Sequence, residues 1–292
     1  MVAAGEEQGG AQKQGREQRR SRGAWSAMEA RGRANTGRGG RVCRIKRWFP
    51  GPSECHTGTI PAYPPRMSKP VIQRFPLGAF QTNCFVAWVP AADAGSVGRE
   101  CWIIDPGEDP EEVIEFVRSK GLVPSHILLT HAHADHIAGL NAVSAAFPAA
   151  RVLLHAEEHA FLNDPQLNLS AFIGMPITTR GADGTLANGD RLELSGSVWR
   201  VLHTPGHSPG GVTIVCDGAN EAFVGDTLFA GSIGRVDFPT SDPATMHRSL
   251  HTVLMALPDS VRAHPGHGPS TTIGAERRTN PWLQDGGWAA EG

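Results

Sequence analysis

The 292-residue sequence has no apolar run long enough to cross a membrane, and it has no apolar segment of the secretory-signal type. We therefore expect a soluble, cytoplasmic protein with no membrane partner. Cysteine is also scarce, because only five are present, an odd number, with no CxxC pair or other metal-binding spacing. This pattern predicts buried, reduced thiols rather than a disulfide framework. The cysteines are Cys43, Cys55, Cys84, Cys101 and Cys216.

Charge is distributed unevenly along the chain. The segment 1–66 has 13 basic and 5 acidic residues, a net charge of +8, whereas the rest of the chain has 14 basic and 24 acidic residues, a net charge of −10. The first segment is rich in Gly, Arg and Gln and has no apolar periodicity, so we expect a disordered basic leader. Its acidic residues count against a transit peptide to an organelle, and its lack of interleaved aromatics counts against nucleic-acid binding. A third alternative is upstream sequence that is not normally translated, because Met67 directly precedes the structured part.

Residues 68–292 have the strand and helix signals of one compact catalytic domain. Strands are expected at 71–75, 83–89, 101–104, 127–130, 152–155, 198–202, 212–216, 222–225 and 261–263, and helices at 135–147, 157–162 and 242–257. The strands form two groups, and each group ends in helices. This order predicts an α/β (α+β) fold in which two β-sheets are stacked between helical layers, a four-layer αββα sandwich.

Two local signals refine this prediction. Asp109 is expected to cap a helix that has Pro110 at its first position and a capping box in its first turn. The pair Asn188-Gly189 is expected to form the turn of a β-hairpin over residues 186–194.

The most informative stretch is HAHADH, residues 131–136, which follows the apolar run 127–129. A strand would place three imidazoles and one carboxylate at its C-terminal end, where a metal ion could gather them. These groups suit Zn²⁺, iron or manganese better than Mg²⁺ or Ca²⁺. A His-rich surface turn is the alternative, but packing gives no reason for four such groups. The candidate ligands are His131, His133, Asp135 and His136.

Three further candidate ligands follow strand-like runs. They are His207 in HTPGHSPGG, Asp226 in FVGDT and His267 in HPGHG, and neighbouring glycines let the backbone approach an ion closely. Seven candidates are too many for one tetrahedral zinc ion. They suit two metal ions that share a bridging ligand.

The order and spacing of these motifs resemble those of the metallo-β-lactamase superfamily, over about residues 68–285. The runs that start at Gly225 and His267 are similar to the short, bacterial form of the glyoxalase II group, the hydroxyacylglutathione hydrolases. The resemblance implies two divalent metal ions, with Zn²⁺ expected first and iron or manganese as alternatives. It implies that Asp226 bridges them, that one ion is held by His131, His133 and His207, and that the other is held by Asp135, His136 and His267.

The activity implied by this resemblance is thioester hydrolysis, with S-lactoylglutathione or a related acylglutathione as the small-molecule substrate. That reaction belongs to methylglyoxal detoxification. A hydroxide shared by two metal ions would attack the thioester carbonyl. Asp226 and Asp135 are the expected catalytic carboxylates, Asp226 as the bridge and Asp135 as a ligand that also accepts a proton.

Other activities remain as alternatives. Residues 130–139 and 234–238 also resemble persulfide dioxygenases, which use a single Fe²⁺ on the same scaffold. The sequence Gly266-His267-Gly268 differs from the His-Asp-Tyr type found in that branch. A metal-binding scaffold with a nucleic-acid-binding leader is disfavoured by the intact ligand set. The sequence around Asp226 also disfavours cleavage of β-lactams.

Three residues beyond the ligand set are candidates for supporting roles. Asp105 either lies behind the metal ions, as the resemblance implies, or is a turn residue before a proline. Arg235 either binds a substrate carboxylate or pairs with Asp237. Arg277 either binds a glutathione carboxylate or lies on a solvated helix face, and His203 is expected to pack rather than to bind metal.

Overall fold

The computed structural model describes residues 69–90 and 99–284, which all belong to a unit that spans Thr59–Gly292. The basic leader and two of the cysteines, Cys43 and Cys55, lie outside the described residues. Within this part of the chain, no helix combines the length and the apolar character that a membrane crossing requires.

Two six-stranded sheets form the centre of the domain. The first sheet has the order β1-β2-β3-β4-β5-β6, with antiparallel pairs from β1 to β3 and parallel pairs from β3 to β6. Its strands are β1 Val71–Leu77, β2 Thr82–Trp88, β3 Arg99–Ile104, β4 Leu122–Leu128, β5 Arg151–His155 and β6 Gly184–Leu186. The second sheet has the order β14-β13-β10-β9-β8-β7, and its strands are β7 Arg191–Leu194, β8 Ser197–His203, β9 Val212–Cys216, β10 Glu221–Gly225, β13 Arg262–Pro265 and β14 Thr271–Thr272.

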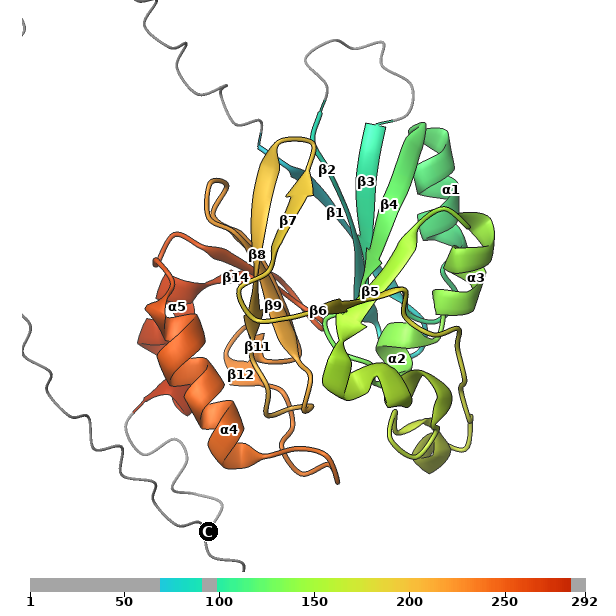
Figure 1. The fold of residues 1–292 in the computed structure, drawn as a ribbon. Coiled ribbons are helices and arrows are strands. Elements are labelled where there is room, and N and C mark those ends of the chain that lie inside the picture. The colour runs from blue at the N-terminus through green and yellow to red at the C-terminus, as the bar shows by residue number, and fades with distance from the viewer. Residues whose placement is uncertain (1–68, 91–98, 285–292) are drawn as a thin grey trace, which may run out of the picture. The chain divides into compact units, whose positions relative to one another are not determined.

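Helices cover the outer face of each sheet (Figure 1). On the first sheet they are α1 Glu111–Ser119, α2 Ala134–Ile137 and α3 Leu140–Ala146, and on the second they are α4 Pro243–Arg248 and α5 Ile273–Thr279. Further elements are the 3₁₀ helices η1 Ala156–Asn163, η2 Ser170–Ile173 and η5 Pro281–Leu283, and the strand pair β11 Leu228–Phe229 and β12 Ser232–Ile233. The predicted four-layer αββα sandwich is therefore confirmed.

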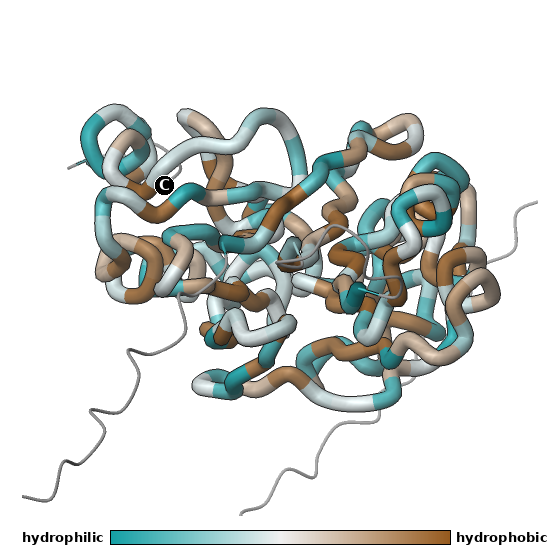
Figure 2. The backbone as a smooth tube through the Cα atoms, turned by 90° about the horizontal axis from the view of Figure 1, so that it is seen from above, coloured by the Kyte–Doolittle hydropathy of each residue, from teal (hydrophilic) through white to brown (hydrophobic). Residues whose placement is uncertain are grey.

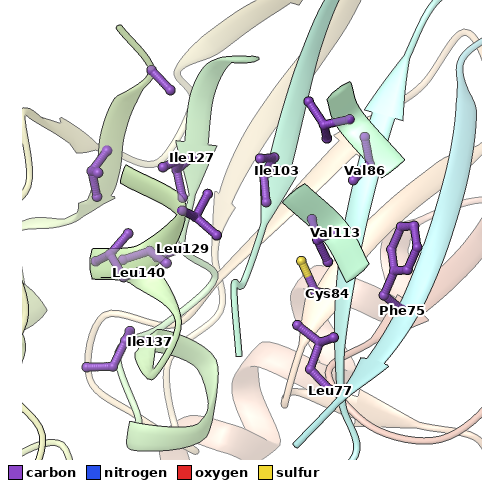
Figure 3. Close-up of a cluster of buried hydrophobic side chains, with 14 of the residues drawn as sticks. Phe75, Leu77, Cys84, Val86, Ile103, Val113, Ile127, Leu129, Ile137 and Leu140 are labelled. Atoms are coloured by element: carbon purple, nitrogen blue, oxygen red, sulfur yellow. The ribbon is translucent and has the colours of Figure 1, made fainter. Parts of the chain in front are cut away.

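Alternating side chains on the strands explain the layers. On β3, Cys101 and Ile103 pack toward α1 and α3, whereas Trp102 and Ile104 pack between the two sheets. Figure 3 shows the first of these clusters, between the strands and the covering helices. A third cluster, which includes Met246, lies between the second sheet and its helices. Figure 2 shows hydrophobic segments on both sides of the domain.

Buried cysteines contribute to these clusters. Cys84, Cys101 and Cys216 are all buried and free, as the sequence predicted. Burial raises the pKa of the Cys101 thiol to about 12, with a smaller contribution from Glu100. These thiols therefore act as small apolar side chains rather than as nucleophiles.

The helix expected over residues 135–147 is interrupted. The structure has two helices instead, Ala134–Ile137 and Leu140–Ala146. Between them, the Gly139 N–H donates to the carbonyl oxygen of Pro106 (2.9 Å). The expectation of one helix was wrong because packing against this neighbouring loop replaces a helical hydrogen bond.

The expected Asp109 cap is also wrong. Helix α1 begins at Glu111, and its N-cap position is Pro110, which makes no side-chain capping bond. Asp109 has a φ of +54°, and this left-handed backbone differs from the extended conformation that a capping residue needs.

The expected hairpin over residues 186–194 does not form, because β6 belongs to the first sheet and β7 to the second. The chain passes from one sheet to the other at Asn188-Gly189. The hairpin in this region instead joins β7 to β8 through Ser195 and Gly196, whose φ values are +47° and +85°. These left-handed conformations suit a tight two-residue turn.

The helical segment expected over 242–257 is present but changes its hydrogen bonding. Asp242 caps it by accepting a hydrogen bond from Thr245 N–H (2.7 Å), and Pro243 occupies the first turn as expected. After α4 the segment continues as the π-helix η3 Ser249–Val253 and the 3₁₀ helix η4 Leu254–Ala256.

Candidate metal centre

The candidate ligands follow four strands. Residues 131–136 follow β4 and run into α2, and His207 lies in the loop after β8. Asp226 directly follows β10, and His267 follows β13. Because β10 and β13 are parallel neighbours, Asp226 and His267 leave the second sheet at the same edge.

Backbone hydrogen bonds join the two sheets at this edge. Asn83 N–H of the first sheet donates to Gly266 O (2.6 Å), and Val212 N–H of the second sheet donates to Thr130 O (2.9 Å). Thr82 and His267 also form an isolated antiparallel bridge. The relative positions of the ligands are therefore fixed by the way the sheets meet.

The structure brings the seven predicted residues together as overlapping groups. His131, His133 and His207 form one group, in which the ligand atoms lie within 4.8 Å of one another, and His133 Nδ1 lies 2.9 Å from His207 Nε2. Asp135, His136 and His267 form another within the same limit.

Asp226 lies between these two groups. Its Oδ1 lies 3.4 Å from His136 Nε2, and its Oδ2 lies 3.4 Å from His267 Nε2 and 3.7 Å from His207 Nε2. Ligand atoms about 2.1 Å from a tetrahedral zinc ion lie about 3.4 Å from one another. The observed separations are therefore those of a coordination shell, and one carboxylate faces both groups.

Buried donor atoms without a hydrogen-bond partner are a second indication of a metal site. Among the described residues, the Nε2 atoms of His131 and His136 and the Oδ1 atom of Asp226 are buried without a hydrogen-bond partner. Buried polar atoms are normally paired. Their convergence on one point, from imidazoles and carboxylates, fits divalent metal ions.

Two histidines are oriented through their other ring nitrogen. Nδ1–H of His207 donates to Arg235 O (2.8 Å), and Nδ1–H of His267 donates to Phe80 O (3.2 Å). This leaves Nε2 of each ring facing Asp226. Ligating histidines are commonly oriented in this way.

Protonation of the metal-free cluster follows from burial and close carboxylates. Burial alone would lower the pKa of His136, but Asp135, Asp226 and Asp105 outweigh it and raise the pKa well above the usual value. For His267, hydrogen bonds to Asp135 and Asp226 overcome burial and raise the pKa to about 9. Without metal, both imidazoles are therefore doubly protonated and positively charged at neutral pH.

Asp105 lies directly behind the cluster. Its carboxylate accepts hydrogen bonds from Thr130 N–H (2.7 Å) and Thr130 Oγ1–H (2.6 Å), and its Oδ2 lies 3.1 Å from His136 Nδ1. This contact turns His136 Nε2 toward Asp226. Asp105 is thus placed to orient a ligand, which is the first of its two predicted roles.

We expect Asp105→Asn to weaken metal binding and activity by about 10–100-fold, the usual effect of altering a group that orients a ligand. Asparagine tolerates the left-handed backbone at this position (φ +52°), so the fold should be retained. Metal content and activity at limiting metal measure the effect. Asp109→Asn is the matched control, because Asp109 is also left-handed (φ +54°) but exposed. An equal loss in both variants would refute the orienting role.

Glu158 is a supporting residue that the sequence did not reveal. Its fully buried carboxylate accepts hydrogen bonds from Ala132 N–H and from Gly210 N–H (2.8 Å). It therefore joins the loop of His131 to the loop of His207. Burial raises the pKa of Glu158 to about 7, although the nearby Ser208 hydroxyl and the two backbone N–H groups oppose the shift.

A cavity of about 530 Å³ opens over the cluster. His133, Asp135, His207, Asp226 and His267 form part of its lining, and much of the remaining wall is apolar. The wall residues outside the cluster include Phe80, Leu169, Phe172, Ile173, Phe229, Arg235 and Phe238. The cluster is therefore accessible to a small molecule.

The structure separates the remaining candidates. Arg235 lines the cavity, and its guanidinium makes a two-point contact with Asp237 (2.8 and 2.7 Å). Arg277 does not line the cavity, since it donates to Met255 O (2.8 Å) and pairs with Asp259. A direct contact of Arg277 with substrate in this cavity is therefore not supported.

His203 packs as expected, with its ring stacked on His155 at 4.2 Å between centroids. Its Nε2–H donates to Pro209 O (2.9 Å). His155, His203 and Glu157 also bring possible ligand atoms within 4.8 Å of one another. The rings are nearly parallel, at 12°, so one ion cannot lie in the plane of both, and this group is a poor metal site.

Comparison with known proteins agrees with this geometry. The sequence profile of the "Metallo-beta-lactamase superfamily" matches residues 77–267. The chain is 35% identical to the "Probable metallo-hydrolase YqgX" of Bacillus subtilis over 212 residues, which are 72% of this chain and 96% of that protein. It is also 35% identical to the "Hydroxyacylglutathione hydrolase GloC" of Haemophilus influenzae over 214 residues, 73% of this chain and 97% of that protein.

Solved structures show the same similarity. BLEG-1, described as a B3 metallo-β-lactamase, has a TM-score of 0.68 and 40% sequence identity to this chain. The match covers 73% of this chain and 100% of the BLEG-1 chain. TTHA1623, solved in a di-iron-bound form, has a TM-score of 0.62 and 36% identity, and the match covers 72% of this chain and 100% of that one. ETHE1 from Myxococcus xanthus has a TM-score of 0.56 and 25% identity, with 73% and 84% coverage.

The stacked sheets and the His/Asp cluster at their common edge are those of a metal-binding hydrolase. The chain belongs to the metallo-β-lactamase superfamily. The resemblance inferred from the sequence motifs is thereby confirmed.

Proposed function

We propose that this protein is a binuclear metal-dependent hydrolase that cleaves thioesters. The observation that carries the proposal is the position of Asp226, whose carboxylate lies 3.4 Å from His136 and from His267 in one group of ligands and 3.7 Å from His207 in the other. His131, His133 and His207 would hold one ion, and Asp135, His136 and His267 the other. Zn²⁺ fits these donors, and iron is a second choice because TTHA1623 binds two iron ions.

When bound, two such ions lower the pKa of a shared water molecule and polarise a carbonyl group. The protein contributes the positions of the reacting groups. Thr82 Oγ1–H donates to Asp135 Oδ2 (2.8 Å), which fixes a carboxylate that also lines the cavity and can accept a proton. A thiolate leaves readily near neutral pH because free thiols have a pKa of about 8.5. Cleavage of a thioester therefore requires no separate acid.

S-Lactoylglutathione is the first substrate to test, because GloC is named a hydroxyacylglutathione hydrolase. The protein should be purified without added metal, its metal content measured, and thiol release followed. We expect about two zinc, iron or manganese ions per chain together with thiol release from a thioester. Loss of activity on chelation, and its return with Zn²⁺, would show that thiol release depends on the bound metal.

Persulfide dioxygenation is the second candidate, because residues 130–139 and 234–238 also resemble that branch of the superfamily. The complete group of Asp135, His136 and His267 favours a second metal ion and hence hydrolysis. One iron ion per chain, with O₂ uptake on glutathione persulfide and no thiol release from any thioester, would overturn the hydrolase.

Metal uptake should release protons. His136 and His267 are protonated in the metal-free protein at pH 7, and a ligating imidazole must be neutral. Affinity should therefore rise as the pH approaches about 9, where His267 becomes neutral without metal. Calorimetric titration with Zn²⁺ in buffers of different ionisation enthalpy measures this release. A binding enthalpy that is independent of the buffer would contradict the predicted protonation.

A further inference from the structure

We propose that the thioester carries a large uncharged apolar arm, which binds against the wall formed by Phe80, Leu169, Phe172, Ile173, Phe229 and Phe238. This inference rests on the proposed hydrolysis and specifies its substrate class. The wall belongs to the same cavity as Asp135, Asp226 and His267, so an arm bound there remains next to the metal ligands. We call these six residues the apolar wall.

Charge in the cavity disfavours a highly charged thiol carrier. Glutathione has two carboxylates and an ammonium group, and binding it needs matching charges. Among the described residues, Arg235 is the only Lys or Arg that lines the cavity, and Asp237 already accepts its hydrogen bonds. The same guanidinium lies 4.6 Å from the ring centroid of Phe238, so it also covers an apolar surface.

The apolar wall is unusually open to solvent. Phe80 is 52% exposed, Phe172 65% and Ile173 44%, and the nearby Met175 is 52% exposed. Among the described residues, only three other large hydrophobic side chains are exposed. A group of exposed apolar side chains at the mouth of a cavity marks a surface that a ligand covers.

The apolar wall is also held in place. The buried Asn168 donates from Nδ2 to Phe161 O (2.8 Å) and Ile177 O (3.0 Å), and its Oδ1 accepts from Ser170 N–H (3.0 Å). Asn168 O accepts from Ala134 N–H (2.8 Å), which lies within the HAHADH motif. The short helix η2, which carries Phe172 and Ile173, is thus anchored to the segment that carries the predicted ligands.

The backbone of Leu169 supports the same conclusion. Its φ is +69°, a left-handed conformation that is costly for a leucine, and its side chain lines the cavity. The Asn168 hydrogen bonds on one side and the helix η2 on the other maintain this conformation. An apolar side chain is therefore kept in the wall at the expense of backbone strain, and a preformed wall lowers the entropy lost on binding.

The test uses the full-length, zinc-loaded protein and two series of thioesters. One series keeps glutathione as the thiol and lengthens the acyl group from acetyl to octanoyl. The other keeps one acyl group and replaces glutathione by an uncharged thiol with an alkyl or benzyl arm. We expect kcat/KM to rise at least about tenfold in one of the series, since each buried CH₂ contributes about 0.8 kcal/mol, or about fourfold.

The variant Phe172→Ala should reduce this gain by about tenfold while it leaves the metal content unchanged. Phe172 is largely exposed, so the fold should be unaffected. Val123→Ala is the matched control, because Val123 is 51% exposed on β4 and does not line the cavity. It should behave as the unchanged protein does.

The outcomes separate this inference from the proposed function. If S-lactoylglutathione is cleaved better than every apolar thioester, the apolar-arm inference is wrong and the hydrolase stands. The inference also fails if Phe172→Ala affects all substrates equally. If the zinc-loaded protein cleaves no thioester of either series, the proposed function itself is wrong.

Discussion

Asp226→Asn is expected to lower thioester hydrolysis by more than about 100-fold and to reduce the metal content below two ions per chain. Groups that merely orient ligands account for about 10–100-fold, so a carboxylate that faces both ligand groups should account for more. Asn has nearly the same shape but no charge, and only one of its two terminal atoms can accept a metal bond. His136 and His267, each 3.4 Å from Asp226, would lose a shared anionic partner.

Metal analysis, activity and thermal unfolding should be measured together on this variant. Asp217→Asn is the control, because Asp217 pairs with Arg200 at the surface and does not line the cavity. It removes one carboxylate of the same type and should keep both metal content and activity. If Asp226→Asn retained two metal ions and full activity, the assignment of Asp226 as the bridge would be wrong.

The ligand cluster was predictable because each candidate directly follows a strand or lies in the loop after one. An apolar run before a polar motif indicates where a strand ends, and this holds for residues 127–136 and for Asp226. The structure places all seven predicted residues within overlapping groups. Their assignment to two metal ions stays a prediction. The fold class followed from the same strand order and was correct.

Other features depend on contacts between distant segments, which local patterns do not contain. Asn188-Gly189 is a good hairpin signal, but β6 pairs with β5 and β7 pairs with β8, so the turn joins two sheets. The break at Gly139 depends on its contact with Pro106.

Supporting residues were hidden for the same reason. Glu158 lies in a short helix without a motif, and its role appears only when Ala132 and Gly210 are brought to it. Arg277 was a candidate for binding a substrate carboxylate, with a solvated helix face as the alternative. In the structure it instead donates to backbone carbonyls, Met255 O and Leu257 O, and pairs with Asp259. Local sequence motifs therefore located the candidate metal ligands better than the residues that support them.

Gly266→Ala is expected to have an effect as large as loss of the bridge, although the residue has no side chain to bind metal. A Cβ at this position would lie 2.1 Å from Asp226 Oδ1 and 2.5 Å from His136 Cε1. Normal contacts need more than 3 Å, so the carboxylate or the imidazole must move by about 1 Å. Displacements of that size cost about 100-fold in activity. We expect this loss together with weaker metal binding.

Gly181→Ala is the matched control for this substitution. Gly181 has open space where its Cβ would lie, so the variant should keep its activity and metal content. The backbone of Gly266 also has a structural role: its carbonyl accepts from Asn83 N–H of the first sheet, and its N–H donates to Gly225 O within the second sheet (2.9 Å). Unfolding must therefore be followed in parallel. A folded Gly266→Ala protein that has lost metal affinity would show that the close approach of the backbone positions Asp226. A folded variant with unchanged metal affinity and activity would contradict that close packing.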